Sequence, residues 1–316
     1  MKFSSLIIFF LFVSQVTFGQ NKMDKAYNNL YWALILQKQN QHKEAVKYFD
    51  KSFDLAFIED SNHKIDAAFS ALKIGEEEKA QKYLSDAVAK YNVPYSFVAD
   101  NDKLKEFDNN RSLKFVKSNF NKLKGQFYAS LPFIDEYIDI DKLRETDQLV
   151  RRFPTMKTDN PVDQKILGKY STYIMNHTDS TNIKTLMEYS KKVGYMHNGY
   201  LLLWHQRLQF PNGEYWSYFK PLIEKEIEKG NLRRWFFTNF EDQVGELLRK
   251  KQTYGTIFPY EVFPLEDVKT VDEKRKKVSL PPLRFMNYIY GYPLPQGYEM
   301  TTEQMLEEMK SRLGND

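Results

Sequence analysis

A helical pattern that repeats after 35 residues constrains the fold of this chain more than any other feature of its sequence. Four positions recur at this spacing: Ala33, Ala45, Phe49 and Ser52 match Ala68, Ala80, Leu84 and Ala87. Small residues at Ala33 and Ala68 let the two helices of a hairpin approach closely, while Phe49 and Leu84 fill the gap between hairpins. The period therefore predicts two stacked helical hairpins.

The two hairpins resemble the tetratricopeptide repeat, whose period is about 34 residues. One position departs from that pattern, because Leu36 and Ala71 stand where a large aromatic is expected late in the first helix. Solenoids usually need three or more units and a cap, so we expect the amphipathic segment from Asp102 to Lys124 to seal the array. The resemblance implies a platform that holds a partner protein or peptide.

The first 19 residues have the features of a secretory signal peptide. Lys2 precedes an apolar run from Leu6 to Val13, and Thr17 and Gly19 are small residues at the spacing that predicts cleavage before Gln20. The apolar run is shorter than the ~20 residues of a membrane span, so we expect no span after cleavage and a periplasmic or secreted protein. The chain has no cysteine, which excludes disulfides, a lipid-modified cysteine and thiolate metal sites.

The rest of the chain is long enough for two domains of ordinary size. We expect the signal peptide over residues 1–19, a tetratricopeptide-like helical domain over residues 20–128 and a second, mainly helical domain over residues 129–316. Apolar residues continue at helical spacing in the second domain, whereas glycines and prolines predict a loop-rich segment at residues 253–282. A last helix is expected to begin at Thr301. The predicted fold class is mostly α.

Charge and aromatic content narrow the kinds of partner. The formal net charge is +4; removing Lys2 with the signal leaves +3, too small an excess to indicate nucleic acid or an anionic membrane. The run EKRKK at residues 273–277 is expected to form a solvated helix face. Aromatic residues make up 16% of the chain, which indicates either bulky core filling or an aromatic groove. A sugar site would need exposed, coplanar rings around Trp204, Trp216 and Trp235.

Polar landmarks follow one another in a set order through the second domain. They are Asp147, Gln148 and Arg152; Asp179 and Asn182; Val193 to Tyr195; His205; Glu241 to Gln243; Lys251 to Thr256; Val271, Asp272 and Arg275; and Ser279 to Leu283. This set resembles an uncharacterised bacterial domain family marked by a histidine, an aspartate and Q-x-Y-G-T. Two places depart from that family, which commonly has Trp-Pro at Tyr195–Met196 and an arginine at Gln243. The resemblance implies a site but assigns no reaction.

We expect the candidate site to form around His205. This histidine follows five apolar or aromatic residues, so its helix is buried and its imidazole needs a hydrogen-bond partner. Asp242 lies inside another apolar helix and is the expected partner. The same site is expected to include Gln252, Tyr254, Gly255 and Thr256, with Asp147, Arg152 and Asn182 as secondary candidates.

This cluster has three interpretations: a buried network that pins a loop, a binding pocket without chemistry, or a catalytic pair. The sequence supplies no G-x-S-x-G elbow, zinc-binding histidine pattern or Gly-rich phosphate loop, and we expect no metal and no cofactor. It favours an exported protein- or peptide-interaction protein whose second domain binds an unknown small ligand. The alternatives are a hydrolase-like enzyme that uses the His205–Asp242 pair, and a glycan-binding protein.

Overall fold

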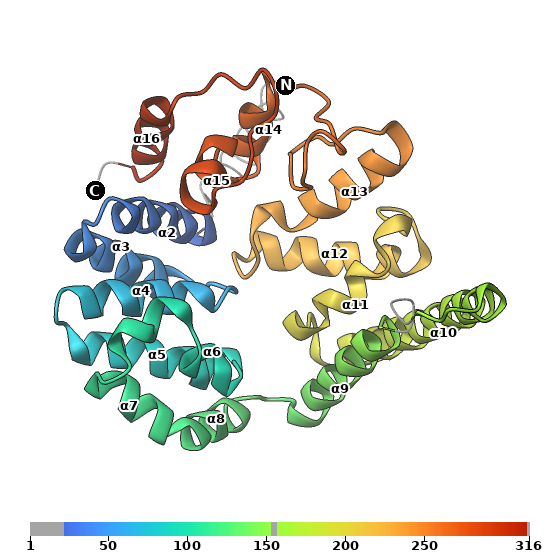
Figure 1. Ribbon diagram of the computed structural model, residues 1–316, viewed down its shortest axis with the longest axis horizontal. Coiled ribbons are helices and arrows are strands. Elements are labelled where there is room, and N and C mark those ends of the chain that lie inside the picture. The colour runs from blue at the N-terminus through green and yellow to red at the C-terminus, as the bar shows by residue number, and fades with distance from the viewer. Residues whose placement is uncertain (1–21, 153–156, 315–316) are drawn as a thin grey trace, which may run out of the picture.

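The computed structural model describes residues 22–152 and 157–314, whose regular secondary structure is helical apart from one isolated parallel bridge between Gln252 and Leu265 (Figure 1). The predicted mostly α fold class is confirmed. Within these ranges no helix is long and apolar enough to cross a membrane. The expected signal peptide and the expected mature start at Gln20 lie outside the described residues, so both stay predictions.

Two helical hairpins form the first part of the structure. They comprise α2 (Lys22–Lys38) with α3 (His42–Leu55), and α4 (Asn62–Lys73) with α5 (Glu77–Tyr91). Ala33, Ala68, Phe49 and Leu84, which the 35-residue period pairs, are all fully buried. Gly75 turns the second hairpin with a φ of +76°, a left-handed conformation that glycine adopts without a steric penalty. The helices therefore lie where the period predicts them, while membership of the tetratricopeptide family stays a prediction.

Short helices follow in the segment that was expected to seal the array. They are α6 (Tyr95–Ala99), the 3-10 helix η1 (Asp102–Phe107), α7 (Arg111–Ser118) and α8 (Phe120–Ala129). The side chains of Asn101 and Asn110 each accept a hydrogen bond from the backbone N–H two residues later, which starts a new helix at each asparagine. Leu113 is fully buried in the core of the hairpins, so the segment covers α5 as several pieces rather than as one helix.

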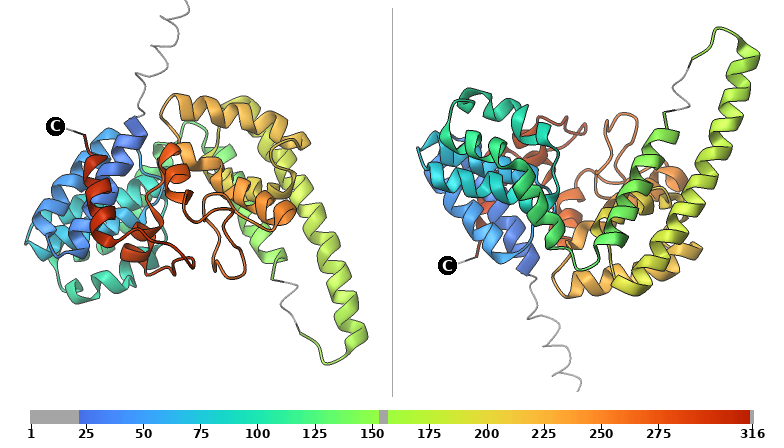
Figure 2. Two further views of the ribbon diagram at one scale, coloured as in Figure 1. Left: turned by 90° about the horizontal axis from the view of Figure 1, so that it is seen from above. Right: turned by 90° about the horizontal axis from the view of Figure 1, so that it is seen from below.

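A hairpin of two helices, α9 (Ile134–Val150) and α10 (Pro161–Val193), begins the second part and projects from the body of the molecule (Figure 2). Asn160 caps α10 and Pro161 occupies its first position, where proline loses no hydrogen bond. We call this hairpin the arm. The remaining helices of the second part are η3 (His197–Gly199), α11 (Tyr200–Trp204), η4 (Arg207–Gln209), α12 (Glu214–Glu228), η5 (Arg234–Phe237) and α13 (Thr238–Arg249).

The end of the chain returns to its beginning. After a long loop come α14 (Val271–Lys277), α15 (Leu283–Tyr290) and α16 (Thr302–Ser311), and Thr301 forms the expected capping box with Gln304. Phe285 of α15 and Met305 of α16 are fully buried in the same hydrophobic core as the hairpins. Figure 1 shows both helices beside α2, so that the helices follow one another around a ring.

This packing bears on the two-domain organisation. The expected boundary between residues 128 and 129 falls between α8 and α9. The sequence assigns α15 and α16 to the second domain, yet they pack on α2, and Asn28 Nδ2 donates a hydrogen bond to the Arg312 carbonyl at 3.1 Å. The first hydrophobic core therefore contains residues from both ends of the chain.

Candidate functional site

His205 lies at the C-terminal end of α11, and its side chain is only 10% exposed. Its Nε2 atom is 3.0 Å from Asp147 Oδ2 and 3.1 Å from Arg151 Nε. Nε2 donates to Asp147 Oδ2 in one tautomer of the imidazole and accepts from Arg151 Nε in the other. Arg151 Nε also donates to the same carboxylate oxygen, at 3.2 Å. His205 thereby joins α11 to the base of the arm.

Arg151 ties the two helices of the arm together. Its guanidinium donates to both oxygens of Asp147 on α9 and pairs with Asp179 on α10. Burial raises the pKa of Asp147, but hydrogen bonds from His205 and Arg151 outweigh it and lower the pKa to about 2. Burial raises the pKa of Asp179, and the nearby Asp147 carboxyl acts in the same direction. The cluster therefore holds one firmly ionised carboxylate and one that is more easily protonated.

Asp242 is fully buried in α13, and it binds the loop that follows its own helix. Its Oδ1 accepts the backbone N–H groups of Thr253 and Tyr254, at 2.6 and 2.9 Å. Its Oδ2 accepts the backbone N–H and the hydroxyl of Thr256, at 2.9 and 2.8 Å. The expected pairing of His205 with Asp242 is therefore wrong: His205 pairs with Asp147, while the oxygens of Asp242 are engaged by the loop.

The other residues expected near Asp242 belong to this loop network. Gln252 donates through its side-chain amide to the carbonyls of Ile257 and Phe263. Gly255 has a φ of +70°, so the positive φ expected there is present. The carbonyl of Tyr254 accepts a hydrogen bond from Arg275 Nη1, at 2.6 Å.

The sequence predicts that Arg275 lies on a solvated helix face, and this prediction is wrong. Arg275 is 2% exposed and also donates to the Pro281 carbonyl, at 2.6 Å. One cation of the EKRKK run therefore points into the protein and holds two loop segments, because their carbonyls offer acceptors that water does not reach.

The secondary candidates separate in the structure. Asp147 belongs to the His205 cluster, whereas Asn182 Nδ2 donates to the Leu143 carbonyl at 3.5 Å and links the arm helices elsewhere. Arg152 lies in the turn after α9, where its backbone N–H donates to the Leu149 carbonyl. The sequence interpretation missed Arg151, although its spacing of four residues from Asp147 is typical of a helical ion pair.

The tryptophans do not form the coplanar platform that a sugar site was expected to need. Trp216 is 1% exposed and meets Phe210 edge to face at 85°. Trp235 packs edge to face against Tyr27 at 77°, and Trp204 meets Phe240 at 63°. These rings fill cores and joints between helices.

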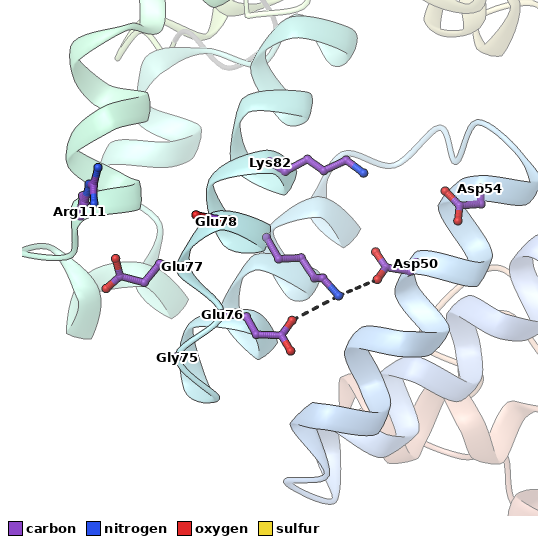
Figure 3. Close-up of a pocket in the computed structure, with 9 residues that line it drawn as sticks. Asp50, Asp54, Gly75, Glu76, Glu77, Glu78, Lys82 and Arg111 are labelled. Atoms are coloured by element: carbon purple, nitrogen blue, oxygen red, sulfur yellow. Dashed lines mark hydrogen bonds and ion pairs between the residues drawn. The ribbon is translucent and has the colours of Figure 1, made fainter.

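A polar hollow of about 980 Å³ lies between α3 and α5 (Figure 3). Its lining is mostly charged, with Asp50 and Glu76 among the acidic residues. Lys79 Nζ lies 3.0 Å from Asp50 and 3.3 Å from Glu76, and so bridges the two hairpins across the hollow. Carboxylates outnumber cations in this lining, and partly exposed ion pairs of this kind contribute little free energy.

A cleft of about 650 Å³ opens where the two parts of the molecule meet. The hairpins contribute Phe57 and Tyr91, and the second part contributes Tyr137, Tyr195 and His197. Phe57 stacks on Tyr91 with ring centres 4.6 Å apart and an interplanar angle of 16°, and Phe57 keeps 48% of its surface exposed. A smaller, apolar recess of about 280 Å³ is also lined by Tyr137, Tyr195 and His197, so the two hollows adjoin along one aromatic wall.

An ion cluster joins the two sides of this cleft. Glu59 follows α3, and its carboxylate oxygens lie 3.2 Å from His197 Nδ1 and 3.2 Å from Arg233 Nη1. Burial raises the pKa of Glu59, but His197 and Arg233 outweigh it, so the net pKa lies below the ordinary value. Glu59 is therefore an anion that holds a cationic edge of the second part against the hairpins.

The sequence interpretation did not single out this cleft. Phe57 and Glu59 lie between the aligned hairpins, outside the repeated positions, and Tyr195 was noted only as a landmark. Among residues 22–152 and 157–314, no group of three or more His, Asp or Glu side chains is arranged to hold a metal ion.

Comparisons of the chain with family models, curated proteins and solved structures found no match. The two family resemblances therefore stay expectations.

Proposed function

We propose that this protein is an exported binding protein that takes a short peptide segment in the cleft between the hairpins and the second part. One observation carries the proposal: a hollow of about 650 Å³ is lined from both sides by aromatic rings and by charged groups of both signs. Ligand sites are typically hollows of about 300–1,000 Å³ with an apolar lining and a few placed polar groups.

The lining favours a peptide over a glycan. The exposed face of Phe57 offers apolar contact, while Asp60, Lys90 and Arg144 add charges of both signs around it. A peptide presents apolar side chains, charges and backbone groups together, which matches this mixture. A glycan-binding protein is the weaker alternative, because the tryptophans are used in packing.

Binding is also favoured over hydrolysis. The hydrolase-like alternative relied on His205 as a base beside Asp242. In the structure His205 Nε2 is engaged with Asp147 and Arg151, and this cluster joins helices of the second part rather than lining the cleft. We assign the His205 cluster and the Asp242 loop to holding the second part in shape.

Selection from a random peptide library displayed on phage tests the proposal, with the chain lacking residues 1–19 as bait. The enriched peptides should bind at least tenfold more weakly to the Phe57→Ala variant, because that side chain is half exposed and lines the cleft. Tyr95→Ala is the matched control, since Tyr95 is 49% exposed on α6 and does not line the cleft.

Two results would overturn the proposal. One is a selection without enrichment, or with peptides that bind the Phe57→Ala variant as tightly as the parent. The other is cleavage of the enriched peptides during incubation, seen by mass spectrometry, which would favour the hydrolase alternative. Binding of oligosaccharides that depends on Phe57, with no peptide enriched, would favour a glycan instead.

A further inference from the structure

We propose that the outer face of α10 is a self-association surface on which a second copy of this chain pairs in an antiparallel, two-fold arrangement. This inference goes beyond the cleft and does not depend on it. It begins from four large apolar side chains on one helix that remain exposed: Val162 (65%), Ile166 (59%), Tyr170 (57%) and Tyr173 (68%).

These side chains form a single stripe. Their spacings of four, four and three residues, followed by exposed His177 four residues later, keep all five within one side of a helix at 3.6 residues per turn. His177 stacks on Tyr173 with an interplanar angle of 10°. Apolar residues three or four positions apart form one face of a helix, which can pack against another helix.

The stripe points away from the rest of the protein. The residues that α10 buries include Asn182, Ile183, Leu186 and Ser190, and at 3.6 residues per turn their mean direction lies roughly 160° around the helix from the stripe. Figure 2 shows α10 projecting from the body of the molecule. A second molecule can therefore reach the stripe without displacing any helix.

The order of the stripe matches an antiparallel copy of itself. When the two-fold axis passes between positions 169 and 170, the Tyr170 side chains of the two copies flank it, Ile166 meets the partner's Tyr173, and Val162 meets the partner's His177. Such a surface is self-complementary, as a two-fold interface must be. Apolar contacts then occupy the axis and the positions on either side of it.

Charge fits the same register. Exposed Asp163 comes to lie beside the partner's His177, and the symmetry makes this contact twice. The Lys169 side chains of both copies flank the axis at the other edge, where their long stems allow the two ammonium groups to stay apart in water. Asp163 on this helix and Asp159 just before it offset Lys165 and Lys169, so the stripe lacks the basic flank that an anionic membrane would favour.

The area that this dimer would bury is also large enough for a stable interface. Covering the five exposed side chains would bury roughly 600 Å² on each copy, or about 1,200 Å² in total, which reaches the lower limit of stable protein interfaces. A stripe of this size lies at the upper end of the apolar patches that monomeric proteins expose, and such patches often serve in binding.

Sedimentation equilibrium on the chain lacking residues 1–19 tests the proposal. The parent should be a dimer, and Ile166→Glu should raise its dissociation constant at least tenfold, because the change is made twice in each dimer. Leu248→Glu is the matched control, since Leu248 is 73% exposed on α13, away from the arm. Asp163→Lys should also weaken the dimer, and adding His177→Glu to it should restore association.

Cross-linking tests the register directly. The chain has no cysteine, so Tyr170→Cys should give a disulfide-linked dimer on mild oxidation, whereas Leu248→Cys should stay monomeric. A parent that sediments as a monomer at every concentration of a 100-fold dilution series would overturn the proposal. So would a dimer that Ile166→Glu leaves unchanged, or binding to phosphatidylglycerol vesicles that requires the stripe.

Discussion

Replacing Phe285 by alanine tests whether the last helices stabilise the first. Phe285 lies on α15, is fully buried, and meets Tyr31 of α2 edge to face with ring centres 5.0 Å apart. Removing a buried phenylalanine side chain costs about 3–5 kcal/mol through lost burial and the cavity left behind. Because its neighbours belong to the core of the hairpins, we expect that loss to appear in α2 to α5 rather than in the second part alone.

Hydrogen exchange followed by mass spectrometry measures this loss separately for each helix. In Phe285→Ala, amides of α2 and α4 should exchange faster, with protection reduced by up to the same 3–5 kcal/mol. Phe219→Ala is the control, because Phe219 is 1% exposed in the core of the second part and should loosen α12 first. Unchanged exchange in α2 and α4 of Phe285→Ala, with faster exchange only beyond residue 130, would refute the reasoning.

Three further substitutions have defined outcomes. Burial lowers the pKa of Lys64 to about 8, so the free energy of unfolding of the parent should rise as the pH goes from about 8 to 10.5. Lys64→Met should remove this rise in urea melts and should increase the free energy of unfolding at pH 7 by up to about 3 kcal/mol. The pKa of Asp147 is lowered to about 2, so its contribution of about 2 kcal/mol is complete above pH 4 and is lost as the pH falls toward 2; Asp147→Asn should abolish that acid-dependent loss in thermal melts. Asp242→Asn replaces an acceptor with a donor that faces N–H groups, and calorimetry should show a loss of about 3 kcal/mol; an unchanged melting temperature would contradict the assigned contacts.

The sequence predicted those features that depend on neighbouring residues. The period places α2 to α5 because each hairpin buries the same positions, such as Ala33 and Ala68. The capping box at Thr301 and Gln304 is likewise local, since both partners lie within one turn. Such patterns need no knowledge of the rest of the chain.

The candidate site could not be predicted to the same extent, because two carboxylates in buried helices were equally suitable partners for His205. Asp147 and Asp242 both lie on helices with buried apolar residues, and both are fully buried. Only the path of the chain decides that Asp147 reaches His205 while Asp242 faces the loop after its own helix. Arg275 shows the same limit, since nothing in a run of cations indicates which one turns inward.

The cleft and the return of the chain end depend on contacts that are distant in sequence. Glu59 and His197 are 138 residues apart, and Asn28 and Arg312 are 284 apart. No repeat or cap within one segment encodes these pairings. They follow from the complementary shapes of surfaces that exist only after each part has folded.

The return of α15 and α16 to α2 has a consequence for synthesis of the protein. The ribosome synthesises α2 long before it reaches the residues that complete the core around this helix. These residues are Phe285, Met305 and Met309. Throughout translation the growing chain therefore carries an uncovered apolar face at its leading end, open to chaperones and prone to aggregation. Any truncation before residue 283 makes this transient state permanent, so a premature stop near the end of the chain would leave α2 without part of its core.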